Sequence, residues 1–401
     1  MGSIILKGKL FTGYDIVENG EIKITGSMIE KVGEKGSIEI KKDDKVFDFS
    51  GLTIMPGLID AHLHFFGGTS HDLMDWVTVN PQTAMLRSTL DAFRLLSSGF
   101  TTVRSLGDKT SIALSRAFKN GELLGPRVFS ASYSIAQTGG DDDPRILPID
   151  IANRLSYSYY CDSPWECRKA VRLCIRDGAD VIKVYASGSF AGGGKIKREL
   201  TVEELSAIVD ESHEAGLKVA AHAYGEEAIS NVIKAGVDSI EHGLGLTEKL
   251  AEEIKEKNMC YVPTLTAYAL SKNKGSEERK KLIERHFNED MEIAKEKKLN
   301  IVAGTDLVGI SEEPHGLNYL EIVHLSKYIG NLDALKAATV NAATCLGINA
   351  GVLKENYIAD IIAIKGNPLN DVNELEPNHV DFVMINGKIA KLNGILMPFG
   401  V

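Results

Sequence analysis

The chain of 401 residues is too long for one small domain and suits a large barrel with a smaller appended domain. Hydrophobic residues make up 44% of the chain, enough for an extensive core. The formal net charge of −10 disfavours a nucleic-acid partner, because proteins that bind the phosphate backbone usually carry excess positive charge.

No apolar run reaches the ~18 residues of a membrane span, and residues 1–11 lack the pattern of a signal peptide. The five cysteines are odd in number and lack metal-knuckle spacing: Cys161, Cys167, Cys174, Cys260 and Cys345. We therefore expect a cytoplasmic protein with five reduced thiols, which binds neither nucleic acid nor a membrane.

The two ends of the chain share a pattern of short strands separated by turns. Residues 1–56 contain three short apolar runs broken by Gly-rich turns, and two further runs lie at residues 359–364 and 382–387. We expect segments 1–56 and 353–401 to pair into one small composite β-sandwich domain, beside a barrel domain formed by residues 57–352.

The middle of the chain carries eight apolar strand candidates. They lie at residues 58–64, 101–106, 127–132, 180–186, 218–224, 239–242, 260–265 and 301–306. Helical patterns separate most of them, at residues 81–97, 162–174, 202–215, 226–235 and 277–297. Nearly continuous apolar strands linked by helices are typical of a parallel sheet. The predicted fold class is therefore α/β, a (β/α)₈ TIM barrel.

Two histidines stand at the end of the first predicted barrel strand. His62 and His64 are two residues apart, so in a strand their side chains point to the same face. Two adjacent imidazoles can hold one divalent metal ion. The alternative is two unrelated histidines near a strand end.

Four later strands carry a residue of metal-ligand type near the C-terminal end, where a barrel places its active site: Lys183, His222, His242 and Asp306. Each has a structural explanation on its own, since a strand histidine is often a core residue and Asp306 could cap a helix. Agreement among five strands is hard to attribute to packing, and it predicts a metal site.

Lys183 is the most informative of these residues. An ammonium group in an apolar strand is costly without a partner, and it must lose its proton before it can bind a metal. Carboxylation by carbon dioxide would turn the amine into an anionic carbamate able to bridge two metal ions. The alternative is a lysine whose amine extends to the strand end.

The segments PGLIDAHLH, VIKVYASG, VAAHAYG, SIEHG and AGTD, in that order, resemble the amidohydrolase superfamily of metal-dependent hydrolases. The similarity spans essentially the whole chain, including DIIAIKGNPL and FVMINGKIA near the C-terminus. The segments GFTTVRSLGD, DSPWECRKAVR and TVEELSAIVDESHEAGLKVAAHA resemble the imidazolonepropionase-like branch, which includes prolidases and carboxypeptidases that release arginine or lysine from dipeptides.

The resemblance implies a centre of two divalent metal ions. The implied ligands are His62, His64 and Asp306 for one ion, His222 and His242 for the other, and carboxylated Lys183, with a hydroxide, for both. Asp306 would take the proton of the hydroxide and pass it to the leaving amine. Zinc suits imidazole and carboxylate ligands, while manganese, iron and cobalt stay open.

Four further positions are candidates for substrate binding. Tyr224 shares a strand face with His222 and could donate to the substrate carbonyl or oxyanion, unless it is an interfacial tyrosine with a hydrated hydroxyl. The acids at 141–143, Asp141 among them, could hold an amino group or a basic side chain, or form a solvated loop. His315 resembles a histidine of the branch near the pocket. Arg198, after a Gly-rich loop, could clamp a carboxylate or lie in solvent.

The predicted function is hydrolysis of the bond to the C-terminal residue of a dipeptide or an N-acyl amino acid. The alternatives are a cyclic amide or lactone hydrolase on the same scaffold, and a non-catalytic binding protein that has kept the barrel. Tyr224 favours proline or an apolar leaving residue, and the acids at 141–143 favour a basic one. A homo-oligomer is expected, because members of this superfamily are frequently oligomers.

Overall fold

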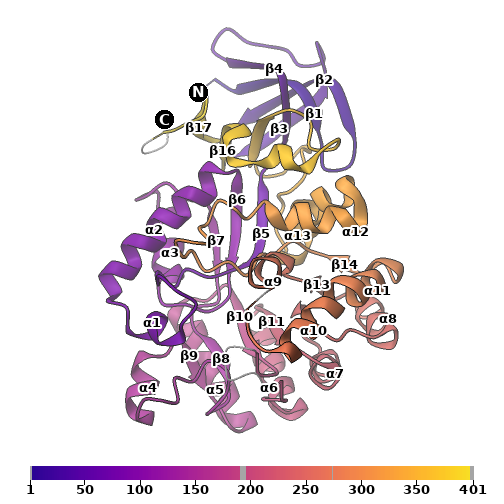
Figure 1. Ribbon diagram of the computed structural model, residues 1–401. Helices are drawn as coiled ribbons and strands as arrows, with labels where there is room; N and C mark the ends of the chain where they lie inside the picture. The colour runs from indigo at the N-terminus through magenta and orange to yellow at the C-terminus, as the bar shows by residue number, and fades with distance from the viewer. Residues whose placement is uncertain (1, 190–195, 273, 398–401) are drawn as a thin grey trace.

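The computed structural model describes residues 2–189, 196–272 and 274–397 (Figure 1). A sheet domain that holds both termini lies at one end of the molecule, and the barrel with its helices lies below it in this view.

The sheet domain takes strands from both ends of the chain. One eight-stranded sheet contains β1 (Ile4–Phe11), β2 (Ile16–Thr25), β3 (Met28–Glu34), β4 (Lys45–Pro56), β15 (Ile361–Lys365), β16 (Val380–Ile385), β17 (Lys388–Leu392) and β18 (Ile395–Leu396). β4 pairs in parallel with β1 and antiparallel with β15, so the two chain ends are bonded directly.

β4 leads through Gly57 into the first barrel strand, β5 (Leu58–Leu63). A Cβ atom at Gly57 would lie 2.2 to 2.8 Å from the side chain of Thr101 in the next strand, so only glycine fits there. The sheet domain is thereby joined to the base of the strand that carries His62.

The barrel wall follows the predicted strand order. Its parallel strands are β5, β6 (Phe100–Ser105), β7 (Arg127–Ser130), β10 (Val181–Tyr185), β11 (Lys218–Ala223), β12 (Ser239–His242), β13 (Cys260–Val262) and β14 (Asn300–Ile301). The Ala61 amide bonds to the carbonyl of Ala303, and Leu63 forms a parallel bridge with Leu307, which closes the ring beyond β14. The TIM-barrel prediction is confirmed.

Two short strands beside the barrel wall were not predicted. β8 (Ser134–Ala136) pairs in parallel with β10 and with β9 (Ser158–Tyr160). Three-residue strands are too short for a periodic pattern, which explains the omission. They flank the loop that carries the acids at 141–143.

Helices cover the outside of the barrel (Figure 1). They are α1 (Leu73–Thr78), α2 (Pro81–Ser97), α3 (Ser111–Lys119), α4 (Ile149–Leu155), α5 (Pro164–Asp177), α6 (Val202–Glu214), α7 (Glu226–Ala235), α8 (Glu248–Glu256), α9 (Leu265–Ser271), α10 (Glu277–Arg285), α11 (Met291–Glu296), α12 (Leu320–Ala337) and α13 (Val340–Leu346). Short turns are η1 (His286–Asp290), η2 (Val372–Leu375) and η3 (Pro377–His379). The helix predicted at 277–297 is divided by η1, a π-helical turn. Within the described ranges, no helix is long and apolar enough to cross a membrane.

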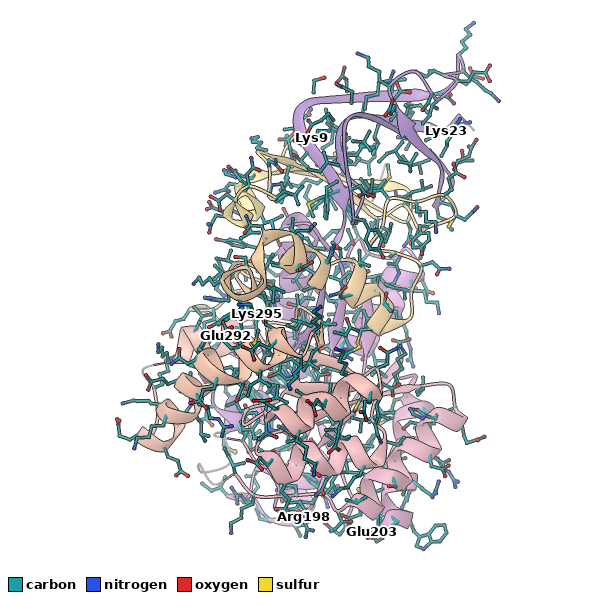
Figure 2. All side chains as sticks on the ribbon, turned by 90° about the vertical axis from the view of Figure 1, so that its right-hand side faces the viewer. Lys9, Lys23, Arg198, Glu203, Glu292 and Lys295 are labelled. Carbon is teal, nitrogen blue, oxygen red and sulfur yellow. A yellow bond between two sulfur atoms is a disulfide. The ribbon has the colours of Figure 1, made fainter. Side chains whose placement is uncertain are left out.

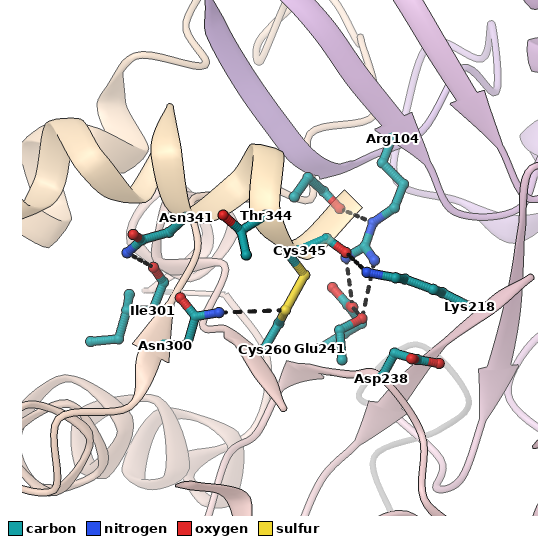
Figure 3. The surroundings of a disulfide bond; sticks show 12 residues. Arg104, Lys218, Asp238, Glu241, Cys260, Asn300, Ile301, Asn341, Thr344 and Cys345 are labelled. Atoms are coloured by element: carbon teal, nitrogen blue, oxygen red, sulfur yellow. Dashed lines mark hydrogen bonds and ion pairs between the residues drawn. A yellow bond between two sulfur atoms is a disulfide. The ribbon is translucent and has the colours of Figure 1, made fainter. Parts of the chain in front are cut away.

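The prediction of five reduced thiols is wrong. Cys161 pairs with Cys167, and Cys260 in β13 pairs with Cys345 in α13 (Figure 3). Cys174 is buried and free. The paired Cα atoms lie 5.0 and 6.2 Å apart, within disulfide range, and only the fold sets these separations. The cytoplasmic location stays a prediction.

Candidate metal centre and active site

His62, His64 and Asp306 meet at the C-terminal end of β5. The Nε2 atoms of His62 and His64 lie 3.3 and 3.1 Å from the same carboxylate oxygen, Oδ1 of Asp306. One ligand atom from each residue lies within 4.8 Å of the other two. The three side chains can therefore hold one metal ion.

The hydrogen bonds of His64 and His62 fix which nitrogen faces Asp306. Nδ1 of His64 donates to the carbonyl of Gly107 at 3.1 Å, and Nδ1 of His62 donates to Glu241 at 2.8 Å. In a neutral imidazole, Nε2 then carries a lone pair. Two such lone pairs point at a carboxylate oxygen, which is repulsive unless a cation lies between them.

His222 and His242 lie beside this group. The ring centroids of His62 and His242 are 4.9 Å apart, and those of His222 and His242 are 4.6 Å apart. Nδ1 of His242 is hydrogen bonded to Oγ1 of Thr264 at 2.8 Å, and a ring nitrogen of His222 bonds to the backbone of Gly188. Among the described residues, Nε2 of His222 is buried and has no hydrogen-bond partner.

Lys183 lies in β10, next to the strand of His222. Its side chain is almost fully buried, with Nζ 5.1 Å from the ring centroid of Tyr185. Burial lowers the pKa of Lys183 because the ammonium loses hydration, although Glu241 and Asp306 oppose this shift. The amine is thus held toward its neutral form inside the cavity that the histidines line.

The protonation states suit metal ligation. Burial lowers the pKa of His222 and His242 well below the usual value, so both rings are neutral. Burial opposes ionisation of Asp306, but the close rings of His62 and His64 outweigh burial and hold the pKa of this carboxyl group well below the usual range. Neutral imidazoles and an ionised carboxylate are the forms that bind metals.

Glu241 and Arg104 form a buried ion pair (Figure 3), and Glu241 is hydrogen bonded to His62. Oε2 of Glu241 accepts from Nδ1 of His62, and Oε1 accepts from Nη2 of Arg104 at 2.8 Å. Burial raises the pKa of Glu241, but Arg104 and His62 outweigh burial and lower it to about 2. The sequence analysis did not predict this series of contacts. A glutamate in an apolar strand, directly before His242, could have indicated a buried ion pair.

His315 does not line the cavity, contrary to the prediction. Its Nε2 lies 3.1 Å from the backbone carbonyl of His64, and its side chain is buried. Asn318 lies 3.4 Å from the other ring nitrogen and donates to Asp60 at 2.6 Å. Asp60 also accepts from the backbone and the hydroxyl of Thr305. His315 therefore belongs to a buried network that fixes the backbone on both sides of the His62–Asp306 contact.

Two candidate ligands have left-handed backbones. φ is 68° at His242 and 58° at Asp306, and it is 52° at Thr264, which bonds to His242. Non-glycine residues rarely adopt this region, and such strain tends to occur at functional sites. Sequence periodicity carries no signal for it.

The six candidate metal ligands form the floor of a cavity of about 390 Å³. An aromatic wall is formed by Phe66, Trp76 and Tyr157, with the Phe66 and Trp76 rings stacked at 4.3 Å. Phe66 also stacks on His64 at 4.7 Å. Other parts of the wall carry acidic and basic side chains: Asp141, Asp142, His71, Lys274 and Arg279. The cavity matches a small molecule with apolar and charged parts.

The model of the Amidohydrolase family matches residues 53–390. The chain belongs to the amidohydrolase family. The ochratoxinase of Aspergillus niger is 31% identical over 429 aligned positions, which cover 98% of this chain and 87% of the relative.

Solved structures agree with this assignment. The crystal structure of A. niger ochratoxinase has a TM-score of 0.92 at 30% identity and covers 100% of this chain and 98% of its own. A Xaa-Pro dipeptidase with bound methionine in its active site has a TM-score of 0.86 at 31% identity, and the match covers 97% of this chain and 100% of the dipeptidase chain. A prolidase complexed with N-methylphosphonate-L-proline has a TM-score of 0.88 at 29% identity, and the match covers 97% of this chain and 100% of the prolidase chain. This amidohydrolase is thus a hydrolase that acts on C–N bonds.

Amidohydrolases generally use metal ions, and the donor set of this chain fits them. The buried Nε2 atom of His222 and the lone pairs of His62 and His64 that face Asp306 are what divalent ions would satisfy.

The acids at 141–143 are buried, so the alternative of a solvated loop is wrong. Asp141 accepts from the backbone and hydroxyl of Ser189, and Asp142 accepts from Ser158 at 2.7 Å and Tyr157 at 2.9 Å. Burial, together with Asp141, raises the pKa of Asp142. Asp141 and Asp142 both line the cavity of this amidohydrolase, so this part of its wall carries two carboxyl groups.

Tyr224 shares the face of His222, with ring centroids 4.3 Å apart. Its hydroxyl lies 2.6 Å from the hydroxyl of Tyr268, and both side chains line the cavity. Tyr224 is buried, so it is not an interfacial tyrosine with a hydrated hydroxyl. Tyr268 was not predicted.

Arg198 is exposed and is not among the described residues that line the cavity. Figure 2 labels Arg198 near the lower edge of the molecule in that view. The geometry therefore gives no support to a carboxylate clamp at Arg198. The predicted loop at 188–194 falls mostly outside the described residues, as does Lys195.

Proposed function

We propose that this amidohydrolase cleaves the amide bond to the C-terminal residue of a dipeptide or an N-acyl amino acid. The observation that carries the proposal is the cavity of about 390 Å³, which has a floor of six ligand-type side chains and charged groups of both signs on its walls. Small zwitterionic or amphipathic substrates suit such a cavity. The Xaa-Pro dipeptidase and prolidase relatives act on molecules of this class.

The proposal includes two divalent metal ions, most simply zinc. His62, His64 and Asp306 would hold one ion, and His222 and His242 the other. Bound ions would supply Lewis-acid activation of water and of the scissile carbonyl. The arrangement of the nitrogen and carboxylate atoms around Asp306 Oδ1 supports this assignment.

Lys183 is proposed to carry the bridging carbamate. Its amine, held toward the neutral form by burial, can add to carbon dioxide with loss of one proton. The product is an anionic ligand in place of a neutral amine in the barrel interior. The anionic charge would in turn compensate the charge of the two ions.

Asp306 and Tyr224 are the proposed groups for proton transfer and oxyanion binding. About a quarter of the Asp306 side chain is accessible from the cavity, and its carboxylate is ionised, so it can accept a proton from water and deliver it to the leaving amine. Tyr224, beside His222, can donate its hydroxyl hydrogen to the developing oxyanion.

The test is a substrate panel with metal-loaded enzyme and the Asp306→Asn variant as the inactive control. The panel pairs dipeptides ending in proline, an apolar residue or a basic residue with the matching N-acetyl amino acids. Turnover of at least one set supports the proposal. Cyclic amides and lactones are assayed beside this panel, and turnover of those compounds alone would replace the proposal with the alternative reaction.

A further inference from the structure

The segment between α9 and α10 forms one wall of the cavity and was not singled out from the sequence. Ser271, Lys274, Gly275 and Arg279 line the cavity there. Two of these residues are cationic, and the wall adjoins the tyrosine pair, Tyr224 and Tyr268. A charged wall next to the proposed oxyanion donor bears on substrate choice.

The guanidinium of Arg279 is held in a fixed orientation. Its Nη1 donates to the backbone carbonyls of Ser271 and Lys274, both at 2.8 Å, and its Nη2 donates to the hydroxyl of Ser271 at 2.6 Å. A guanidinium oriented before binding loses less conformational entropy when it meets a planar anion.

The electrostatic surroundings of Arg279 favour an anionic ligand. Burial lowers the pKa of Arg279, while the hydroxyls of Tyr224 and Tyr268 oppose this shift. Arginine nevertheless stays protonated, and a carboxylate bound in the cavity would interact favourably with its charge. Bidentate bonds from arginine to a carboxylate are among the strongest that side chains make.

The tyrosine pair connects this cation to the candidate metal ligands. The Tyr224 and Tyr268 hydroxyls are 2.6 Å apart, and both rings lie close to His242, with centroids 5.3 and 6.2 Å away. Arg279 interacts electrostatically with both tyrosines, so an anion bound to it would lie near the tyrosine pair beside His242. Asp141 and Asp142 occupy a different loop of the wall, after β8.

We infer that Arg279 binds the α-carboxylate of the substrate's leaving residue and thereby restricts the enzyme to amides of free amino acids. The inference rests on the proposed function and names the side chain that recognises the carboxylate of its substrate. Lys274 adds positive charge to the same wall, with Glu313 3.8 Å from its amine.

The experiment compares kcat/KM for a good dipeptide and for its C-terminal amide, in wild type and in Arg279→Met. Wild type is expected to prefer the acid by about 10-fold or more, because each ~1.4 kcal/mol of transition-state binding is tenfold. Arg279→Met should lose that factor on the acid and change little on the amide. The matched control is Lys280→Met, which removes a cation that pairs with Glu277 in the same helix and should behave as wild type.

The outcomes separate the inference from the proposed function. Wild type that cleaves neither acid nor amide contradicts the proposed function. Wild type that cleaves both equally, or Arg279→Met that loses both in the same proportion, overturns the inference and leaves the proposed function standing. Arg279→Lys serves if the methionine variant does not fold. It should keep part of the acid preference through a single-pronged contact, and an unchanged preference would also overturn the inference.

Discussion

Removal of the Cys260–Cys345 disulfide is expected to destabilise the protein more than removal of Cys161–Cys167. The first bond joins β13 to α13 (Figure 3) and spans 85 residues of sequence, which include Asp306 and Arg279. The second spans six residues. A disulfide stabilises mainly by restricting the unfolded chain, and the restriction grows with loop length.

The magnitude follows from these separations. In the loop-closure model, the unfolded chain loses about 2.1 + 1.5R ln n cal/mol/K. With the separation of 85, this is about 15 cal/mol/K, or ~4.6 kcal/mol at 25 °C. With the separation of 6, it is about 7 cal/mol/K, or ~2.2 kcal/mol. Cys260 and Cys345 also lie in a buried apolar cluster, so alanine at both positions adds a packing loss.

The assay is urea unfolding of the double variants Cys260→Ala/Cys345→Ala and Cys161→Ala/Cys167→Ala, beside wild type. The difference between the two variants in free energy of unfolding should be about 2 kcal/mol or more. Thiol titration of the denatured, unreduced wild type should count one thiol, that of Cys174. Five titrated thiols, or a larger loss for the 161–167 pair, would refute the reasoning.

Three further predictions concern the site. Asp306→Asn should keep the fold and lower kcat by about 10²- to 10⁴-fold through loss of a general acid–base, and near-full turnover with metal bound would contradict that role. Lys183→Ala should bind less metal by elemental analysis, with partial rescue of activity by a short carboxylic acid; two equivalents retained in the variant would exclude bridging. Glu241→Gln leaves buried Arg104 without its carboxylate and should lower the free energy of unfolding by about 3–5 kcal/mol. Since the pKa of Glu241 is lowered from 4.5 to about 2, its contribution is complete above pH 4.5 and is lost as the pH falls toward 2, so the stability gap between wild type and variant should close over that range.

Local patterns in the sequence determined the barrel and the positions of the candidate ligands. Strand periodicity places His62 and His64 on one face, and parallel strands bring their C-terminal ends to one rim, where His222 and Asp306 also lie. Helix signals were equally local: α2 and α7 have the predicted bounds. Such features depend on neighbours a few residues away, which a sequence displays directly.

The tertiary structure alone decided which distant side chains meet. Glu241 reaches His62 across 179 residues, and Cys345 reaches Cys260 across 85. Arg279 lines the cavity although no local pattern marks it, whereas Arg198, with a better sequence argument, is exposed. Periodicity fixes the face of a strand or helix on which a side chain lies. The contacts across the barrel depend on how all strands and loops pack together, and this packing sets the partners of a buried charge or thiol.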